Sequence, residues 1–367
     1  MVNATSLRSH SFTALMLALG GAGGALAQRA GLPMPWMLGA LMATGLFARF
    51  APASYFESYG FPTRFRIFFV ALIGVMIGTQ VTPDLLAMAP DLALTLGALV
   101  VFVPMAHLFN MAVFRRIGGY DRVTAFYAAT PGGLMESITM GDAAGADIQR
   151  LTVQQFLRIV VVITLLPLGL SLWTGQAVGS AAGMALPGQD TPVPPLSLVL
   201  IAAAAVLGLS AGTRIGLPAA QLTGPLLIAA FATVTGVLDL HLPVWLIAVA
   251  QVVIGTSLGL RFQGVEGALL RRSVGLSALS VSGMLLIGAG FAAALSHVTG
   301  IAWLHLFIAF APGGVAEMSL VALSLAASPA LVSLHHVVRI LITVVEMPLT
   351  ARRLGLRAQD RAPAKRG

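Results

Sequence analysis

Two short glycine motifs occur twice in this chain, in the same order and at nearly the same spacing. Gly31-Leu32-Pro33 returns 185 residues later as Gly216-Leu217-Pro218. Pro131-Gly132-Gly133 returns 181 residues later as Pro312-Gly313-Gly314. Ordered matches over most of the chain indicate an internal duplication, so the second half is expected to fold as the first half does.

Each half holds six apolar segments of about 17 to 26 residues, close to the ~20 residues that span a bilayer as a helix. In the first half they lie at about 12–30, 34–50, 65–82, 91–114, 123–141 and 151–174. In the second half they lie at about 196–213, 219–238, 244–262, 273–296, 301–327 and 330–351. Only 9% of the residues are charged, against roughly 25% in a soluble domain, and the mean hydropathy is +0.92. The sequence therefore predicts an all-α polytopic membrane protein.

The distribution of arginine predicts that the two halves have opposite orientations in the membrane. The connection after the second apolar segment carries Arg49, Arg64 and Arg66 in the first half, whereas its counterpart in the second half carries no Lys or Arg. In the connection after the third segment the distribution of arginine is reversed: Arg261 and Arg271 lie in the second half, and the first half has no Lys or Arg there. Because Lys and Arg concentrate in cytoplasmic loops, we expect the halves to be inverted repeats.

An inverted half must cross the membrane an odd number of times, yet each half has six apolar segments. One segment in each half therefore returns to its starting side or stops half-way. The candidates lie around 123–141 and 301–327, because proline and paired glycines interrupt a helix. We expect two inverted-topology repeats with about 10 transmembrane helices, plus two re-entrant or broken helices that carry Pro-Gly-Gly.

This topology divides the chain into four parts. Residues 1–174 form the first membrane repeat and residues 196–351 form the second. Residues 175–195 contain no Lys or Arg and are expected to be an extracytoplasmic linker. Residues 352–367 contain six Lys or Arg and are expected to be a basic cytoplasmic tail. Both termini are then cytoplasmic.

The two helix breaks are the candidate binding site. Non-helical backbone at membrane depth is tolerated only where it lines a cavity or is buried in protein. The helix after each break begins near Gly132-Gly133 or Gly313-Gly314, with unpaired N–H groups and a positive dipole end that can hold an anion. The alternative is a kink that only packs.

Glu136 and Glu317 follow the breaks, in the first turn of the next helix. They are interpreted either as acids that complement the helix dipole or as protonatable or cation-coordinating groups near the midplane. Arg158 and Arg339 each follow their glutamate by 22 residues. Each arginine either pairs with the acid of its own half, which is the favoured interpretation, or binds a substrate carboxylate.

Other residue patterns argue against an enzyme. The chain has no cysteine, and it shows neither a His-x-x-x-His pair, a Gly-x-Ser-x-Gly elbow nor a phosphate loop. The pairs Gln154-Gln155 and His335-His336 occupy equivalent positions and are interpreted as polar packing. We therefore expect no enzymatic activity, no cofactor and no metal. The expected partners are the lipid bilayer and a small-molecule or ion substrate, with no nucleic acid; a homodimer is left open.

With Gly-Leu-Pro-x-x-x-x-x-Gly and Pro-Gly-Gly-x-x-Glu each present twice, the chain resembles the AbrB membrane-protein family, which carries a duplicated AbrB domain. The resemblance implies a multi-pass protein of the bacterial inner membrane, in a family labelled either ammonia monooxygenase or regulator of gene expression. The family is in turn distantly similar to the cation/proton antiporter and anion transporter superfamily. By that analogy Gly132, Gly133, Gly313 and Gly314 would frame the translocation site.

The functional expectation is a secondary transporter of a small polar, anionic solute that works by alternating access. Glu136 or Glu317 would couple transport to protons or to a cation. Two alternatives stay open at this point. One is a membrane-embedded regulator or sensor that transports nothing, and the other is a channel for a small neutral molecule such as ammonia.

Overall fold

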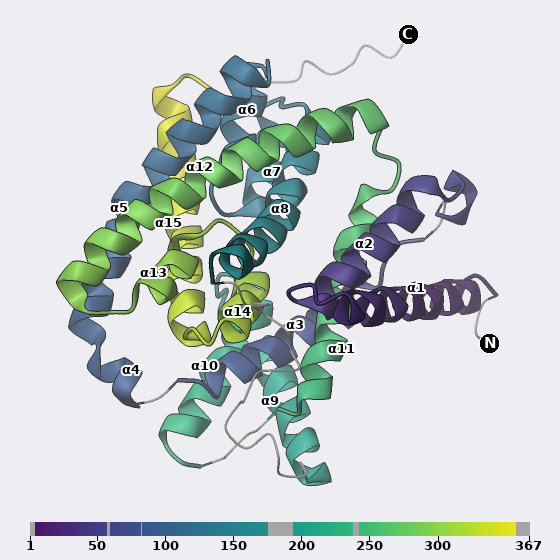
Figure 1. Cartoon of the computed structure of the whole chain (residues 1–367), viewed down its shortest axis with the longest axis vertical. Helices are drawn as coiled ribbons and strands as arrows, with labels where there is room; N and C mark the ends of the chain where they lie inside the picture. Colours follow the sequence, from purple (N-terminus) through teal and green to yellow (C-terminus); the bar gives the residue numbers. More distant parts are fainter. Residues whose placement is uncertain (1–3, 57–58, 82, 175–193, 238–241, 357–367) are drawn as a thin grey trace.

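The protein is described here by a computed structural model that covers residues 4–56, 59–81, 83–174, 194–237 and 242–356 (Figure 1). Within these ranges it contains helices and no strands, which confirms the predicted all-α class. Seven of the described helices are long and apolar enough to cross a membrane. Residues 175–193 of the predicted linker and residues 357–367 of the predicted basic tail lie outside the described residues.

The helices follow the predicted segments closely. Those of the first half are α1 (Ala4–Arg29), α2 (Pro35–Phe50), α3 (Thr63–Gly78), α4 (Pro83–Ala87), α5 (Ala89–Ala112), α6 (Arg122–Ala128), α7 (Leu134–Ala143) and α8 (Ile148–Thr174). Those of the second half are α9 (Pro195–Arg214), α10 (Ala220–Val234), α11 (Val244–Gly259), α12 (Gly267–Thr299), α13 (Trp303–Phe310), α14 (Val315–Ser324) and α15 (Pro329–Arg353). Apart from the short α4, the two sets match one to one in order.

The Gly-Leu-Pro motif forms the same turn in both halves. Gly31 and Gly216 end α1 and α9 with φ values of 68° and 70°, a conformation that glycine adopts at little cost. Met34 and Ala219 follow in the left-handed region, with φ values of 47° and 49°, and α2 and α10 begin directly after them. Two matched pairs of unusual backbone angles support the duplication inferred from the motifs.

The helices form two bundles that lie side by side (Figure 1). The first, called here the six-helix bundle, consists of α1, α2, α3, α9, α10 and α11. The second, called the broken-helix bundle, consists of α5 to α8 and α12 to α15. In the six-helix bundle α3 packs on α10 and α11 packs on α2, so each contact joins the two halves of the chain.

Glycines bring these helix pairs into close contact. A Cβ at Gly74 or Gly78 of α3 would overlap backbone of α10, at the carbonyl oxygens of Leu222 and Leu226. In the equivalent contact, Gly255 and Gly259 of α11 lie against the carbonyl oxygens of Met37 and Leu41 of α2. Small residues at four-residue spacing permit this approach of two backbones in a bilayer.

Replacement of Gly78 by leucine is expected to lower the unfolding temperature strongly, because the new side chain would overlap both Leu226 and the Cβ of Ala229. Overpacking of this kind costs about 1–3 kcal/mol or more. Gly97→Leu on α5 is the matched control, since no atom lies within 4 Å of a Cβ at that position. Thermal unfolding of the two purified variants tests the contact, and equal unfolding temperatures would contradict it.

Both Pro-Gly-Gly segments interrupt the helix, as predicted. The first separates α6 from α7 and the second separates α13 from α14. In the first half the end of α7 lies beside the start of α6. The N–H of Asp147, which follows α7, donates a hydrogen bond to Oγ1 of Thr124 in the first turn of α6, at 2.8 Å. These two helices therefore form a hairpin.

The hairpin begins at a well-formed cap. The Asp121 carboxylate accepts hydrogen bonds from the N–H groups of Val123 (3.0 Å) and Thr124 (2.9 Å) at the start of α6. Partial burial by itself raises the pKa of this carboxyl, but the hydrogen bonds from Thr124 and Val123 outweigh burial and hold the pKa below its ordinary value. The carboxylate form that caps α6 is thereby favoured.

Candidate functional site

Buried polar side chains satisfy the carboxyl end of α6. The last carbonyl groups of a helix lack partners within the helix and carry a partial negative charge. Here they accept hydrogen bonds from α5 and α8: His107 to Phe126 O (2.9 Å), Asn110 to Ala129 O (3.1 Å), Gln155 to Tyr127 O (3.0 Å) and Arg158 to Thr130 O. Four polar side chains on two helices that pack on α6 therefore hold the first break in place.

Arg339 performs the same task at the second break. Its guanidinium donates to Ala311 O at 2.5 Å and to Gly313 O at 2.8 Å, which closes the carboxyl end of α13. Arg339 lies on α15, at the position equivalent to Arg158 on α8, and both side chains are buried, with 1% and 6% of their surface exposed. Each half thus places one arginine against its own break.

The predicted ion pairs between these arginines and the glutamates are not formed. Among the described residues the salt bridges are Arg150–Asp147 and His107–Glu346, and neither includes Arg158 or Arg339. The physical reason lies in the order of the elements along the chain. Each arginine reaches the carboxyl end of the helix before the break, whereas each glutamate lies on the helix after it. The two guanidinium groups are left without a carboxylate, and each Nε is buried without a hydrogen-bond partner.

Each break also packs against the opposite half of the chain. A Cβ at Gly132 would lie 3.2 Å from Oγ1 of Thr343 and 3.8 Å from Nε of Arg339, both on α15. A Cβ at Gly313 would lie 3.3 Å from Val162 on α8, the position equivalent to Thr343 in the repeat. The first break therefore lies against α15 and the second against α8, the equivalent helix of the other half. Arg339 on α15 lies next to both breaks.

The two glutamates have different surroundings, although the motif around them is the same. Glu317 is buried, with 8% of its surface exposed, and its carboxylate lies against Gly314 at the amino end of α14. Glu136 is exposed on the first turn of α7. The repeat is thus asymmetric at its acids, since the acid after the second break is buried and the acid after the first is exposed.

Further polar atoms near the breaks are buried without partners. They are Oε1 of Gln155 and Nε2 of His335. Both His335 and His336 donate through Nδ1 to the carbonyl four residues earlier, at 2.9 Å, and the ring of His336 also interacts with the backbone of Ala311. The polar-packing interpretation therefore accounts for His336 but for one nitrogen only of His335. Unpaired buried polar atoms are rare in proteins and call for a ligand or a water.

The pair His107–Glu346 was not foreseen from the sequence. His107 on α5 and Glu346 on α15 approach to 2.9 Å, and the other nitrogen of the ring contacts Phe126 O at the end of α6. Glu346 has no acidic counterpart in the first half, so the repeat gave no signal for a partner. The contact ties the last helix of the chain to the first break.

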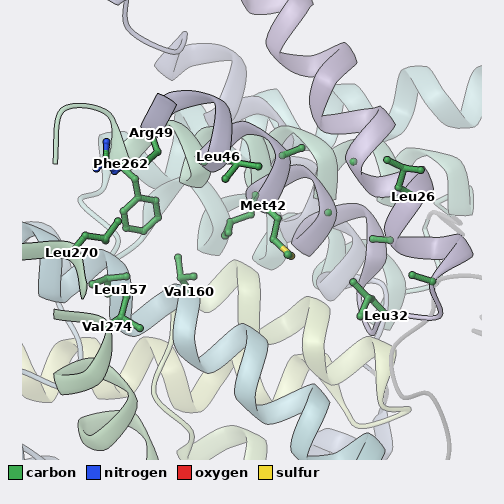
Figure 2. Close-up of a pocket in the computed structure, with 17 residues that line it drawn as sticks. Leu26, Leu32, Met42, Leu46, Arg49, Leu157, Val160, Phe262, Leu270 and Val274 are labelled. Carbon is green, nitrogen blue, oxygen red and sulfur yellow. The ribbon is translucent and has the colours of Figure 1, made fainter. Parts of the chain in front are cut away.

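A cavity of about 630 Å³ lies between the two bundles (Figure 2). From the six-helix bundle α1 and α2 line it, and from the broken-helix bundle α8 and α12 do so. The larger side chains around it are Met42, Leu46, Leu157, Val160, Leu270 and Val274. The lining is apolar except for Arg49, so few hydrogen bonds hold the bundles together along this face.

Comparison with known proteins places most of the chain in one family. A family model described as "Transition state regulatory protein AbrB" matches residues 36–355. The protein YhjN of Bacillus subtilis (strain 168) is 26% identical over 353 residues, which cover 90% of each chain. A protein of Escherichia coli (strain K12) with the name "Putative regulator AbrB" is 27% identical over 297 residues, which cover 80% of this chain and 83% of that one.

Proposed function

The chain belongs to the AbrB family, and we propose that it is a secondary transporter of a small anionic solute that works by alternating access. The observation that carries the proposal is the pair of buried arginines without carboxylates. A buried charge is costly unless it is paired, and arginine is almost never fully buried without a partner. An anionic solute at the two breaks would supply the negative charge that no carboxylate among the described residues provides.

The chemistry at the breaks favours an oxyanion such as a carboxylate. Arg158 and Arg339 present a free Nε each, and the amino ends of α7 and α14 offer backbone N–H groups nearby. The unpaired Nε2 of His335 adds a further hydrogen-bonding group. Planar guanidinium groups suit carboxylate and phosphate oxygens in particular.

The directions of the helices support inverted repeats. Along α11, Gly255 and then Gly259 contact Met37 and then Leu41 of α2. The contacts follow the same order along both helices, so α2 and α11 run in parallel. Successive spans α2 and α3 would cross the membrane in opposite directions. Because α11 is the repeat equivalent of α3, the two equivalents then run in opposite directions, as inversion requires.

Two bundles with an apolar boundary suit the movement that alternating access needs. The breaks and the arginines belong to the broken-helix bundle, whereas the six-helix bundle is held together by close glycine contacts. The cavity between them offers room for displacement along a face with few hydrogen bonds (Figure 2). We infer that the broken-helix bundle carries the solute across, in a bacterial inner membrane with both termini in the cytoplasm.

Transport in proteoliposomes tests this function. The purified protein is reconstituted, and currents or uptake are recorded after a concentration jump of acetate, succinate, citrate, sulfate or phosphate. We expect saturable uptake of at least one of these anions, which empty liposomes do not show. Absence of uptake for every anion, in vesicles whose protein is shown to be folded, would contradict the proposal.

A second candidate function comes from the names of the relatives. The family model and the Escherichia coli protein are both named as regulators. By analogy the chain would then be a membrane-embedded regulator that acts through a protein partner. A stable complex with a cytoplasmic protein, found together with no anion flux, would favour this candidate over transport.

A further inference from the structure

A second group of arginines lies outside the breaks, in a cavity of about 270 Å³ in the six-helix bundle. The start of α3 contributes Thr63 and Arg66, and the end of α11 with the turn after it contributes Ser257, Arg261 and Gln263. The cavity is slightly smaller than the ~300–1,000 Å³ typical of sites for drug-sized ligands. Its size suits a small ion or a single headgroup.

The charges in this cavity are unbalanced. Arg66 and Arg261 are close enough to repel each other electrostatically, and the residues that line the cavity include no acid. Neither arginine forms a salt bridge among the described residues. Two like charges in one polar cavity whose lining includes no acid attract an anion.

The surroundings hold one of the two guanidinium groups in place. Arg261 stacks over the ring of Phe156 on α8, with its Cζ 5.0 Å from the ring centroid, which leaves its N–H groups available at the ring edge. Hydroxyl groups from Thr63, Ser257 and Tyr59 also line the cavity. Tyr59 is itself fixed by a 3.0 Å hydrogen bond between its hydroxyl group and that of Thr13.

We propose that this cavity is a second anion site, in which Arg66 and Arg261 together bind a phosphate or carboxylate group. Both arginines lie at helix ends that the charge distribution assigns to the cytoplasmic side, where the group could come from a free anion or from an anionic lipid headgroup. Arg66 also interacts electrostatically with the buried Glu317, so an anion here would change the potential at the breaks. The site stands on its own residues and does not depend on transport.

Binding is tested on the full-length protein in nanodiscs by thermal unfolding. In discs of phosphatidylcholine alone, inorganic phosphate is titrated at constant ionic strength; in a second series phosphatidylglycerol replaces part of the lipid. The variant Arg66→Gln/Arg261→Gln removes the site. The variant Arg64→Gln/Arg271→Gln changes the net charge equally, at exposed positions of α3 and α12 that do not line the cavity.

We expect a saturable rise in unfolding temperature for the wild type and the control, and at least a 10-fold weaker response for the cavity variant. A response to phosphate identifies a free anion, and a response to phosphatidylglycerol alone identifies a lipid headgroup. Arg66→Lys/Arg261→Lys should also bind more weakly than wild type, which keeps the test valid should the glutamine variant not fold.

The variant Arg339→Lys separates this proposal from transport, because it alters the breaks and leaves the cavity intact. Its response to phosphate or phosphatidylglycerol should persist whether or not anion uptake is lost. Equal responses of the cavity variant and the charge-matched control, or no response of the wild type to either probe, would overturn the second anion site.

Discussion

Lysine in place of Arg339 is expected to raise the half-saturating anion concentration for uptake by about 10- to 100-fold. Lysine keeps the positive charge but loses the fork that donates to both Ala311 and Gly313, together with the free Nε. A hydrogen bond to a charged group is worth about 1.5–3 kcal/mol, which corresponds to this range of affinity. Arg158→Lys should have an effect of the same kind at the first break.

Two exposed arginines on the same helices provide controls. Arg150 lies on α8 with Arg158 and pairs with Asp147 at 3.1 Å, and Arg352 lies at the end of α15 with Arg339. Arg150→Lys and Arg352→Lys should leave the concentration dependence of uptake unchanged within about twofold. Initial rates in proteoliposomes over a range of anion concentrations measure all four variants. A wild-type concentration dependence in Arg339→Lys would show that the arginine only supports the fold.

Glutamine in place of Glu317 is expected to abolish anion accumulation driven by a pH gradient, whereas Glu136→Gln leaves it nearly unchanged. A carboxylate that is buried in the first turn after the second break changes the charge near that break when it takes up or releases a proton. The charge of an exposed carboxylate such as Glu136 is screened by water, so its protonation has little effect on the site. The two substitutions are chemically identical and occur at equivalent positions of the repeat, so each is the control for the other.

Uptake against a concentration gradient, with and without an imposed pH difference, measures this effect. Exchange of anion across the membrane without net accumulation should survive in Glu317→Gln, because the arginines and the breaks remain. Equal loss in both variants would contradict the asymmetry. A full response to the pH difference in Glu317→Gln would exclude this residue as the coupling group.

Much of the helix pattern was predictable because it is local. Proline and paired glycines interrupt a helix wherever they stand, so Pro131-Gly132-Gly133 and its copy fixed both breaks from the motif alone. Glycine at position 31 or 216 similarly marks the end of a helix through its positive φ. Matched motifs then placed Arg158 and Arg339 at equivalent positions without any structure.

The surroundings of the charged residues were not predictable in the same way. Sequence spacing put an acid and an arginine in each half and favoured an ion pair, but it could not show that Arg339 reaches back to the carbonyls of α13. Equal motifs around Glu136 and Glu317 gave no sign that only the second is buried. Both outcomes depend on contacts between distant segments, such as Gly132 with α15, which no local pattern encodes.

The division into two bundles is a further property of long-range packing. The duplication predicts that equivalent helices exist, but not that α3 pairs with α10 and α11 with α2. His107 and Glu346 lie 239 residues apart in the chain and meet only because α5 and α15 are neighbours. Pairings of this kind follow from the whole fold.

Thermal unfolding of the purified protein with a panel of small anions tests the central claim most directly, namely that the two breaks and their arginines form an anion site. A ligand at a hundred times its Kd stabilises a folded protein by about 2.7 kcal/mol. The protein carries Arg66→Gln/Arg261→Gln throughout, so that the second anion site cannot respond. We predict that at least one carboxylate or phosphate raises its unfolding temperature, that adding Arg158→Lys/Arg339→Lys abolishes this rise, and that adding Arg150→Lys/Arg352→Lys does not. An equal rise with either addition, or no rise in the protein without them, would contradict the claim.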